Sequence, residues 1–351
     1  MTRIVFASPA EPSGASWLIN CFLELGVKVA HKPVADAAWR QSATPRDSIW
    51  QPDGHGRHRL HPRAAVLKKF LPALTRVDTF QFREDVEVEY VQDLPDSAPA
   101  ADHVLCFVRD PRDSLYSAFR RMQPAMDYHR FLRFPDPDTL LDRPSQWQLW
   151  VERWQALPDA AWFTFEAYKQ DANALLRRIV DRLEIASGDD AIARAVAEST
   201  FDKARQAEAQ YRPRGGDDTG LVNRSGRVGD WADHPEGRAG AVTIEAKAGA
   251  ALRALGYACR RPADGGAEHD PGATLSELSA FAADIAEEDL RGTNLPNHRI
   301  HRLLENLQRV AQANGWESAS RLEALRQRFV EGSAHHFAQM RELLMQQRQR
   351  S

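Results

Sequence analysis

Residues 104–121 read VLCFVRDPRDSLYSAFRR: an apolar run, a charged turn and an amphipathic segment. The apolar run at 104–108 has the length and composition of a buried strand. Asp110 and Pro111 follow it, and these residue types cap a helix and occupy its first turn. A buried strand that passes directly into a helix is typical of a parallel α/β sheet, in which ligands bind at the carboxyl ends of the strands.

Similar strand-to-helix units lie on both sides of this stretch. Apolar or alternating runs predict strands at 4–7, 86–91 and 162–165. Apolar residues at helical spacing predict one helix at 17–25 and another at 168–183. Together these units predict an α/β fold with a central parallel sheet flanked by helices.

The chain changes character after residue 260. Residues 261–273 are rich in Pro, Gly, Asp and Ala without an apolar period, which is typical of a linker. Beyond them, apolar residues recur at helical spacing. We therefore predict an α/β domain at 1–260, a linker at 261–273 and a C-terminal α-helical extension at 274–351. The apolar stripes of the extension could pack on the domain, form a homodimer interface or bind a protein partner.

The composition of the 351 residues limits the classes of function. The 46 Lys and Arg residues nearly balance the 49 Asp and Glu residues, so nucleic acid is not expected as a partner and any anion site must be local. The three cysteines stand far apart, which argues against a disulfide framework or a cysteine zinc site. No run approaches the roughly 18 apolar residues of a membrane span, and no secretory signal is recognised. We expect a soluble, cytoplasmic protein.

Two segments have residue types that bind phosphate. Residues 8–18 form a turn that leads into a helix, where backbone N–H groups and the hydroxyls of Ser13 and Ser16 could cradle an anion, or merely cap the helix. Arg109 follows a buried strand and Ser117 lies two turns into the next helix. An arginine there can make charge-assisted contacts to a phosphate, each worth about 1.5 to 3 kcal/mol, or can pair with a neighbouring aspartate.

A third segment, residues 223–231, reads NRSGRVGDW. Its two arginines and two glycines allow a loop to close backbone and guanidinium groups over an anion. Taken alone, such a loop is more typical of a solvated linker. The pattern GxxxxGK[ST] of ATP-binding loops does not occur in the chain.

Together, the three segments resemble the motifs of the PAPS-dependent sulfotransferases, where PAPS is 3′-phosphoadenosine 5′-phosphosulfate. SGASWL at 13–18 resembles the family's phosphosulfate loop, and VRDPRD at 108–113 followed by Ser117 resembles its 3′-phosphate signature. RSGRVGDW at 224–231 is similar to its late Arg-x-Gly-x-x-Gly-Asp-Trp loop. The resemblance implies a P-loop-like nucleotide fold over residues 1–260, PAPS as the sulfuryl donor, and no metal.

The resemblance also implies roles for eleven residues. It assigns the 3′-phosphate to Arg109, Ser117, Arg224, Ser225 and Gly226. It assigns the 5′-phosphosulfate to Ser13, Gly14, Ala15 and Ser16. It places two aromatic residues beside the adenine, Trp17 and Phe201.

The chain departs from the family pattern where the reaction occurs. The family usually has Lys or Arg directly before the Ser-Gly pair, where it stabilises the leaving phosphate, and here that residue is Pro12. Lys32, Arg112 or the helix N–H groups could replace that cation, or the enzyme could be slow. A histidine usually serves as the base in the segment before the 104–108 strand, and here the corresponding residue is Asp93. A carboxylate can act as this base, although Asp93 could also simply begin a turn.

His61 is a weaker candidate for the base. It lies in a basic segment with two further histidines, before a helix expected at 64–74, and a solvated loop is the alternative. For the acceptor, a glycan or small metabolite is favoured over tyrosine or another phenol. The competing hypotheses are a non-catalytic PAPS-binding scaffold, suggested by Pro12, and an ATP-dependent phosphotransferase.

Overall fold

The computed structural model describes residues 1–31, 49–95, 97–122, 124–210, 223–260, 271–293, 295 and 297–329. The chain forms two compact units. The first comprises residues 1–121 and 149–238, and the second comprises residues 122–148 and 239–351. The second unit thus combines the C-terminal region with an internal segment. The domain boundaries expected from the sequence, at 260 and 274, stay a prediction.

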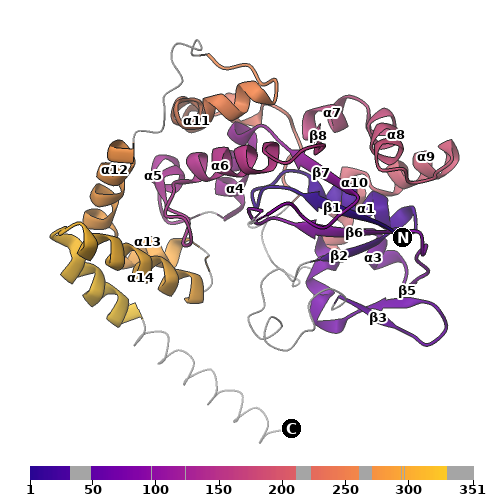
Figure 1. Ribbon diagram of the computed structural model, residues 1–351, viewed down its shortest axis with the longest axis horizontal. Coiled ribbons are helices and arrows are strands. Elements are labelled where there is room, and N and C mark those ends of the chain that lie inside the picture. Colours follow the sequence, from indigo (N-terminus) through magenta and orange to yellow (C-terminus); the bar gives the residue numbers. More distant parts are fainter. Residues whose placement is uncertain are drawn as a thin grey trace, which may run out of the picture. The chain divides into compact units, whose positions relative to one another are not determined.

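A five-stranded sheet forms the centre of the first unit, in the order β2-β6-β1-β7-β8 (Figure 1). Its strands are β1 (Thr2–Ala7), β2 (Lys28–His31), β6 (Val86–Val91), β7 (His103–Val108) and β8 (Ala161–Thr164). All neighbouring strands run parallel, which confirms the predicted sheet.

The register of the sheet determines where the site forms. Ala7, the last residue of β1, is paired with Val91 of β6 and with Cys106 of β7. Val108 of β7 is paired with Thr164 of β8. The carboxyl ends of these four strands therefore lie at one end of the sheet, and the segments that follow them meet there.

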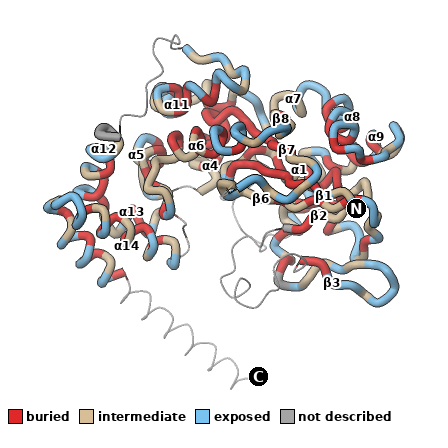
Figure 2. Tube along the Cα trace, viewed as in Figure 1, coloured by how far each residue is buried: buried red, intermediate tan, exposed pale blue. Residues whose placement is uncertain are grey.

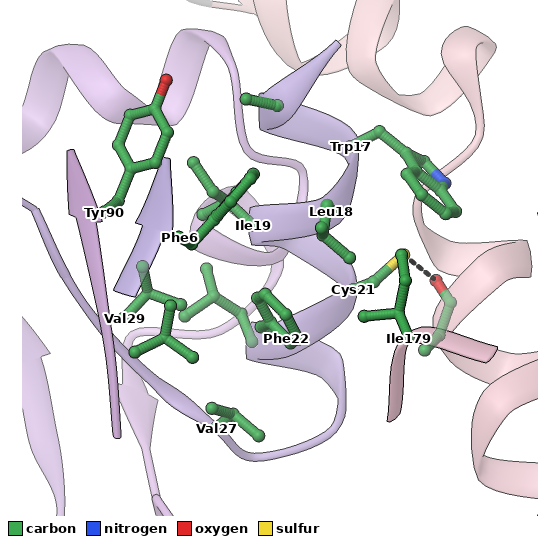
Figure 3. Close-up of a cluster of buried hydrophobic side chains, with 14 of the residues drawn as sticks. Phe6, Trp17, Leu18, Ile19, Cys21, Phe22, Val27, Val29, Tyr90 and Ile179 are labelled. Carbon is green, nitrogen blue, oxygen red and sulfur yellow. Dashed lines mark hydrogen bonds between the residues drawn. The ribbon is translucent and has the colours of Figure 1, made fainter. Parts of the chain in front are cut away.

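Apolar residues of the sheet and of α1 (Ala15–Glu24) form the core of this unit. Phe6 of β1 meets Phe22 of α1 edge to face, with ring centroids 6.2 Å apart. Figure 3 shows Phe6 and Val29 of the sheet facing Leu18 and Phe22 of α1. The two central strands β1 and β7 are mostly buried, as expected for a parallel sheet covered by helices, whereas buried and partly buried residues alternate along β6 and β8 is mostly partly buried (Figure 2). Gly26 has a φ of 71°, and it ends α1 in the left-handed conformation typical of this position.

The helix expected at 168–183 is wrong as a single element. The structure has two helices, α7 (Phe165–Gln170) and α8 (Ala172–Arg182), which meet at Asp171. The Asp171 carboxylate accepts a hydrogen bond of 2.9 Å from the backbone N–H of Ala174, so it caps α8 and ends α7. The other helices of the chain up to residue 254 include α4 (Pro111–Met122), α6 (Arg143–Gln155), α9 (Asp189–Glu198), α10 (Phe201–Gln210) and α11 (Pro235–Ala254).

The segment around His61 also differs from the expectation. A three-stranded antiparallel sheet occupies it, made of β3 (Trp50–Pro52), β4 (His58–Leu60) and β5 (Thr79–Phe80). The helix expected at 64–74 is instead a 3-10 helix, η1 (Pro62–Lys69), and a short helix, α3 (Ala73–Arg76). Pro72 separates them, because its ring and missing N–H prevent one α-helix from continuing through this position.

Helices make up most of the second unit, which confirms the C-terminal helical region. They include most of α11, and α5 (Tyr128–Arg133), α12 (Pro271–Asp284), α13 (Glu287–Gly292), α14 (Asn297–Ala313) and a helical stretch at 318–329. The apolar residues of α12, α13, α14 and the 318–329 stretch pack on one another and on Phe134, which follows α5. In the part of the chain that the structure describes, no helix is both long and apolar enough to cross a membrane.

Candidate active site

A cavity of about 480 Å³ opens at the carboxyl ends of the parallel strands. Its lining residues all belong to the first unit, and its volume is typical of small-molecule and cofactor sites. All eleven residues predicted to bind the nucleotide line it: Ser13, Gly14, Ala15, Ser16, Trp17, Arg109, Ser117, Phe201, Arg224, Ser225 and Gly226. The fold thus brings three segments that are distant in the sequence around one space.

The loop after β1 depends on a glycine. Gly14 has a φ of 87°, in the left-handed region that favours glycine. A Cβ at this position would lie 2.4 Å from Cδ2 of Phe165, the first residue of α7. The loop can therefore lie directly against α7, and α1 begins at the next residue. The N–H of Ala15 donates to the Ser13 hydroxyl at 3.3 Å and that of Trp17 to the Gly14 carbonyl at 2.9 Å, and the positive end of the helix faces the space that an anion would occupy.

A chain of buried polar groups holds this loop. The Ser13 hydroxyl lies 2.8 Å from the Ser8 hydroxyl, which lies 3.2 Å from the Tyr90 hydroxyl. The side-chain amide of Gln92 donates to Tyr90 at 3.1 Å, and both residues line the cavity. Burial raises the pKa of Tyr90, so its phenol stays protonated. Sequence reasoning missed Tyr90, although its place near the end of a predicted strand was a usable signal.

Arg109 leaves β7 and turns into the cavity wall. It is 5 % exposed, and its guanidinium carbon lies 4.5 Å from the ring centroid of Phe165. Its Nη2 donates to the carbonyl of Arg227 at 2.6 Å and lies 3.8 Å from Asp113 Oδ2. Among the described residues, its buried Nε has no hydrogen-bond partner. Burial lowers the pKa of Arg109, which nevertheless remains charged.

Asp113 connects α4 to the loop at 223–231. Its carboxylate accepts hydrogen bonds from the backbone N–H groups of Gly229, at 2.7 Å, and of Trp231, at 3.3 Å. Burial raises the pKa of Asp113, although Arg109 and these two donors lower it. One buried carboxylate therefore fixes the loop beside the arginine that follows β7.

The same loop carries Arg224 and Gly226. Arg224 forms a salt bridge with Asp230, and its buried Nε has no hydrogen-bond partner in the described part of the chain. Burial alone would raise the pKa of Asp230, yet the hydrogen bond and charge of Arg224 hold that pKa below its ordinary value. Gly226 has a φ of 59°, and a Cβ there would lie 2.8 Å from the Phe201 ring. This close approach places the loop backbone against the predicted adenine-side aromatic.

Aromatic rings form another part of the cavity wall. The rings of Trp17 and Tyr168 are stacked, with centroids 4.3 Å apart and planes at 28°. Both residues line the cavity, as does Phe165. Such rings offer flat apolar surface to a nucleotide base.

Asp93 follows β6, as expected, but it does not point into this space. It is exposed and is not among the residues that line the cavity, whereas its neighbour Gln92 is. Two buried tryptophans of α6 hold this segment, because Trp150 donates to the carbonyl of Gln92 at 3.0 Å and Trp154 donates to that of Asp93 at 3.3 Å. The role of Asp93 stays a prediction.

The other residues singled out in the sequence lie elsewhere. His61 is partly buried and does not line the cavity. Arg112 is buried and bound by the Asp110 carboxylate, with Nη2 to Oδ2 at 2.6 Å, and it does not line the cavity either. Lys32 lies outside the described residues. Over the residues that can be described, no group of three or more His, Cys, Asp and Glu side chains could hold a metal ion.

Sequence reasoning also missed Arg121. This residue lies on α4, four positions after Ser117, and therefore on the same face of the helix. It lines the cavity together with Ser117 and Arg109. The spacing of four was the signal that could have identified it.

These features define a class: an α/β protein whose strand-end cavity, built from arginines, hydroxyls and a helix N-terminus, suits a phosphate-bearing ligand. Comparison with protein families identifies that class more closely. The family model described as the sulfotransferase domain matches residues 94–236, which include Arg109, Ser117 and the 224–226 loop. The chain therefore carries a sulfotransferase domain, and the family predicted from its motifs is confirmed.

Two solved structures are similar to this chain at low sequence identity. A mouse sulfotransferase, SULT7A1, complexed with PAP is 16 % identical, with a TM-score of 0.43, over 72 % of this chain and 87 % of that one. A retinol dehydratase in complex with retinol and PAP is 17 % identical, with a TM-score of 0.47, over 74 % of this chain and 83 % of its own. Comparison with the curated proteins finds no match.

Proposed function

We propose that this protein transfers the sulfuryl group of PAPS to an acceptor hydroxyl. The acceptor oxygen attacks the sulfur, and the bond between sulfur and the oxygen of the 5′-phosphate breaks. The electron pair of that bond stays on the phosphate oxygen, and the acceptor's proton passes to a base. The products are a sulfate ester and 3′-phosphoadenosine 5′-phosphate, PAP.

The observation that carries this proposal is the meeting of three motifs around one cavity. Arg109 and Arg224 both line it, and each has a buried Nε without a partner in the described part of the chain. Buried guanidinium nitrogens in this state suit an anion of fixed position, and the two arginines with Ser117 suit the 3′-phosphate. The N-terminus of α1 and the Ser13 hydroxyl suit the phosphosulfate.

For the base we propose Asp93, with His61 as the weaker alternative. The proposal rests on the position of Asp93 after β6, beside the cavity-lining Gln92. The structure adds Glu11 as a further candidate for the base. Among the described residues, it is the one Asp or Glu that lines the cavity.

The base can be identified by comparing Asp93→Asn with Glu11→Gln. Loss of the base lowers turnover by about 10² to 10⁴ while leaving PAP affinity unchanged. We expect this result for Asp93→Asn, measured as turnover at saturating PAPS and as PAP affinity by calorimetry. Normal turnover of Asp93→Asn would remove Asp93 from the mechanism, and a loss confined to Glu11→Gln would move the role to Glu11.

For the acceptor we propose a hydroxyl of a glycan or small metabolite, with a phenol as the second choice. The segment η1 contributes the apolar side chains of Val66 and Leu67 to the cavity, and Phe70 follows them. An apolar wall of this kind suits the body of a phenol or the apolar face of a sugar ring. We also propose a cytoplasmic location, supported by three cysteines that form no disulfide with one another, and a homodimer or protein partner for the C-terminal helices.

The proposed function can be tested without knowing the acceptor. The protein is titrated with PAP in a calorimeter and then incubated with labelled PAPS, or with labelled ATP, and a panel of sugars and phenols. We expect PAP binding and a labelled sulfate ester formed only from PAPS. PAP binding without any transfer would favour a non-catalytic scaffold, and transfer from ATP would show a phosphotransferase.

A further inference from the structure

Arg121 is a cation in the cavity wall that the proposed contacts to PAPS do not use. It lies in the last turn of α4, is partly buried and lines the cavity. Its guanidinium forms no hydrogen bond or salt bridge with any residue that the structure describes. Glu11 and Glu208 act on it only through their charge, and burial lowers the pKa of Arg121.

The other two arginines of the cavity wall are already engaged. Arg109 donates to the carbonyl of Arg227, and Arg224 is paired with Asp230. Glu208 is likewise occupied, because it accepts hydrogen bonds from the backbone and side-chain amides of Asn223 at 3.0 and 3.1 Å. Partial burial of an arginine without a partner costs free energy, unless an anion binds its guanidinium. Arg121 is therefore the arginine of this wall whose guanidinium is not held by a described residue, and the 3′-phosphate proposed for Arg109 and Arg224 does not occupy it.

The loop that would hold the phosphosulfate needs such a cation. Residues 8–16 contain no Lys or Arg, and the one charged side chain among them is the carboxylate of Glu11. Arg121 is close enough to this loop for Glu11 to act on its charge. Arg121 also lies one helical turn after Ser117 on α4. It is therefore farther than Ser117 from the end of β7, where Arg109 lies.

We propose that Arg121 contacts the sulfuryl group during transfer and stabilises the negative charge that develops between the sulfur and the leaving phosphate. This inference rests on the proposed function. A guanidinium presents several N–H donors in one plane, so it can bind two oxygens of the moving group at once. Interactions that strengthen as this charge develops lower the barrier of the chemical step.

PAP and PAPS are the probes that test this role, because PAP lacks the sulfuryl group. We expect Arg121→Gln to bind PAP as the wild type does, and to lose turnover of PAPS by about 10²- to 10³-fold. Turnover is followed both as sulfate ester formed and as sulfate released to water when no acceptor is present. Release to water needs no acceptor, so a loss there places Arg121 at the sulfuryl group and not at the acceptor.

Arg120→Gln is the matched control. Arg120 is the adjacent residue on the same helix, but its side chain is 40 % exposed, donates to the Tyr116 hydroxyl at 2.9 Å and does not line the cavity. This variant removes the same charge, and we expect it to keep turnover. Thermal unfolding of both variants checks the fold, and Arg121→Met, which keeps much of the apolar stem, replaces Arg121→Gln if the latter does not fold.

Three outcomes would overturn the role of Arg121: unchanged turnover in its variants, an equal loss of PAP and PAPS affinity, or a loss limited to anionic acceptors. The second outcome would place Arg121 at the nucleotide, and the third would place it at the acceptor. A wild-type protein that neither binds PAP nor consumes PAPS would instead overturn the proposed function, and this inference with it.

Discussion

At the scale of single residues, the site depends on close approaches that only small residues permit. Gly14 lies against Phe165 and Gly226 lies against Phe201, both with positive φ. Each contact brings a loop backbone to an aromatic ring that lines the cavity. A side chain at either position would have to displace that ring or the loop.

Gly14→Ala tests the first of these contacts. We expect it to lower the free energy of unfolding by more than the roughly 1 to 2 kcal/mol of left-handed strain, because its Cβ would also meet Phe165 at 2.4 Å. PAP affinity, measured by calorimetry, should fall as well. Gly54→Ala is the control, since Gly54 has a φ of 80° but nothing within 4 Å of the added Cβ. Equal destabilisation of the two variants would show that the Phe165 contact does not matter.

At the scale of elements, the strands could be predicted from the sequence more fully than the breaks and faces of the helices. The parallel sheet follows from apolar runs of the right length, and β1, β6, β7 and β8 all occur where the runs lie. The break at Asp171 was missed because apolar spacing continues through it, and a single capping carboxylate outweighs that spacing. Arg121 lines the cavity because it lies on the same face of α4 as Ser117. A search for motifs does not consider the faces of helices.

Asp113→Asn tests the connection between α4 and the 223–231 loop. Asparagine has one acceptor oxygen where aspartate has two, so one of the N–H groups of Gly229 and Trp231 would lose its partner. We expect a loss of about 1 to 3 kcal/mol in the free energy of unfolding, and weaker binding of PAP.

Asp110→Asn provides the matched comparison for Asp113→Asn. The variant removes the same charge at the start of α4. In the wild type, however, the Asp110 carboxylate binds the Arg112 guanidinium and not the 223–231 loop. We expect this variant to lose stability and to keep its affinity for PAP in calorimetry. A larger loss of PAP affinity in Asp110→Asn than in Asp113→Asn would contradict the assigned role of Asp113.

At the scale of the whole molecule, the C-terminal helices have a core of their own. Their apolar stripes pack together and on Phe134, a residue from the middle of the chain. The sequence shows the stripes but not this contact, because 140 or more positions separate Phe134 from its partners Leu278, Leu303 and Leu325. A residue-by-residue pattern contains no information about such a distant contact.

Leu303→Ala tests whether this core is separate from the cavity. Leu303 is fully buried in α14, so we expect a loss of about 2 to 5 kcal/mol and faster amide hydrogen exchange in α12 and α14. PAP affinity should stay unchanged, because every residue lining the cavity lies in the other unit. Leu275→Ala, at a position that is 42 % exposed, is the control and should cost little. Reduced PAP affinity in Leu303→Ala alone would disprove the separation.

The hydrogen bonds of Asp113 to the 223–231 loop also have a kinetic consequence. Residues 224–226 of this loop line the cavity, and Arg109 bonds the loop again at Arg227. A product lying beneath the loop would leave after these bonds open, so their strength would set the residence time of PAP. Weakening them would then shorten that residence time, and turnover would rise wherever departure of the product is the slowest step.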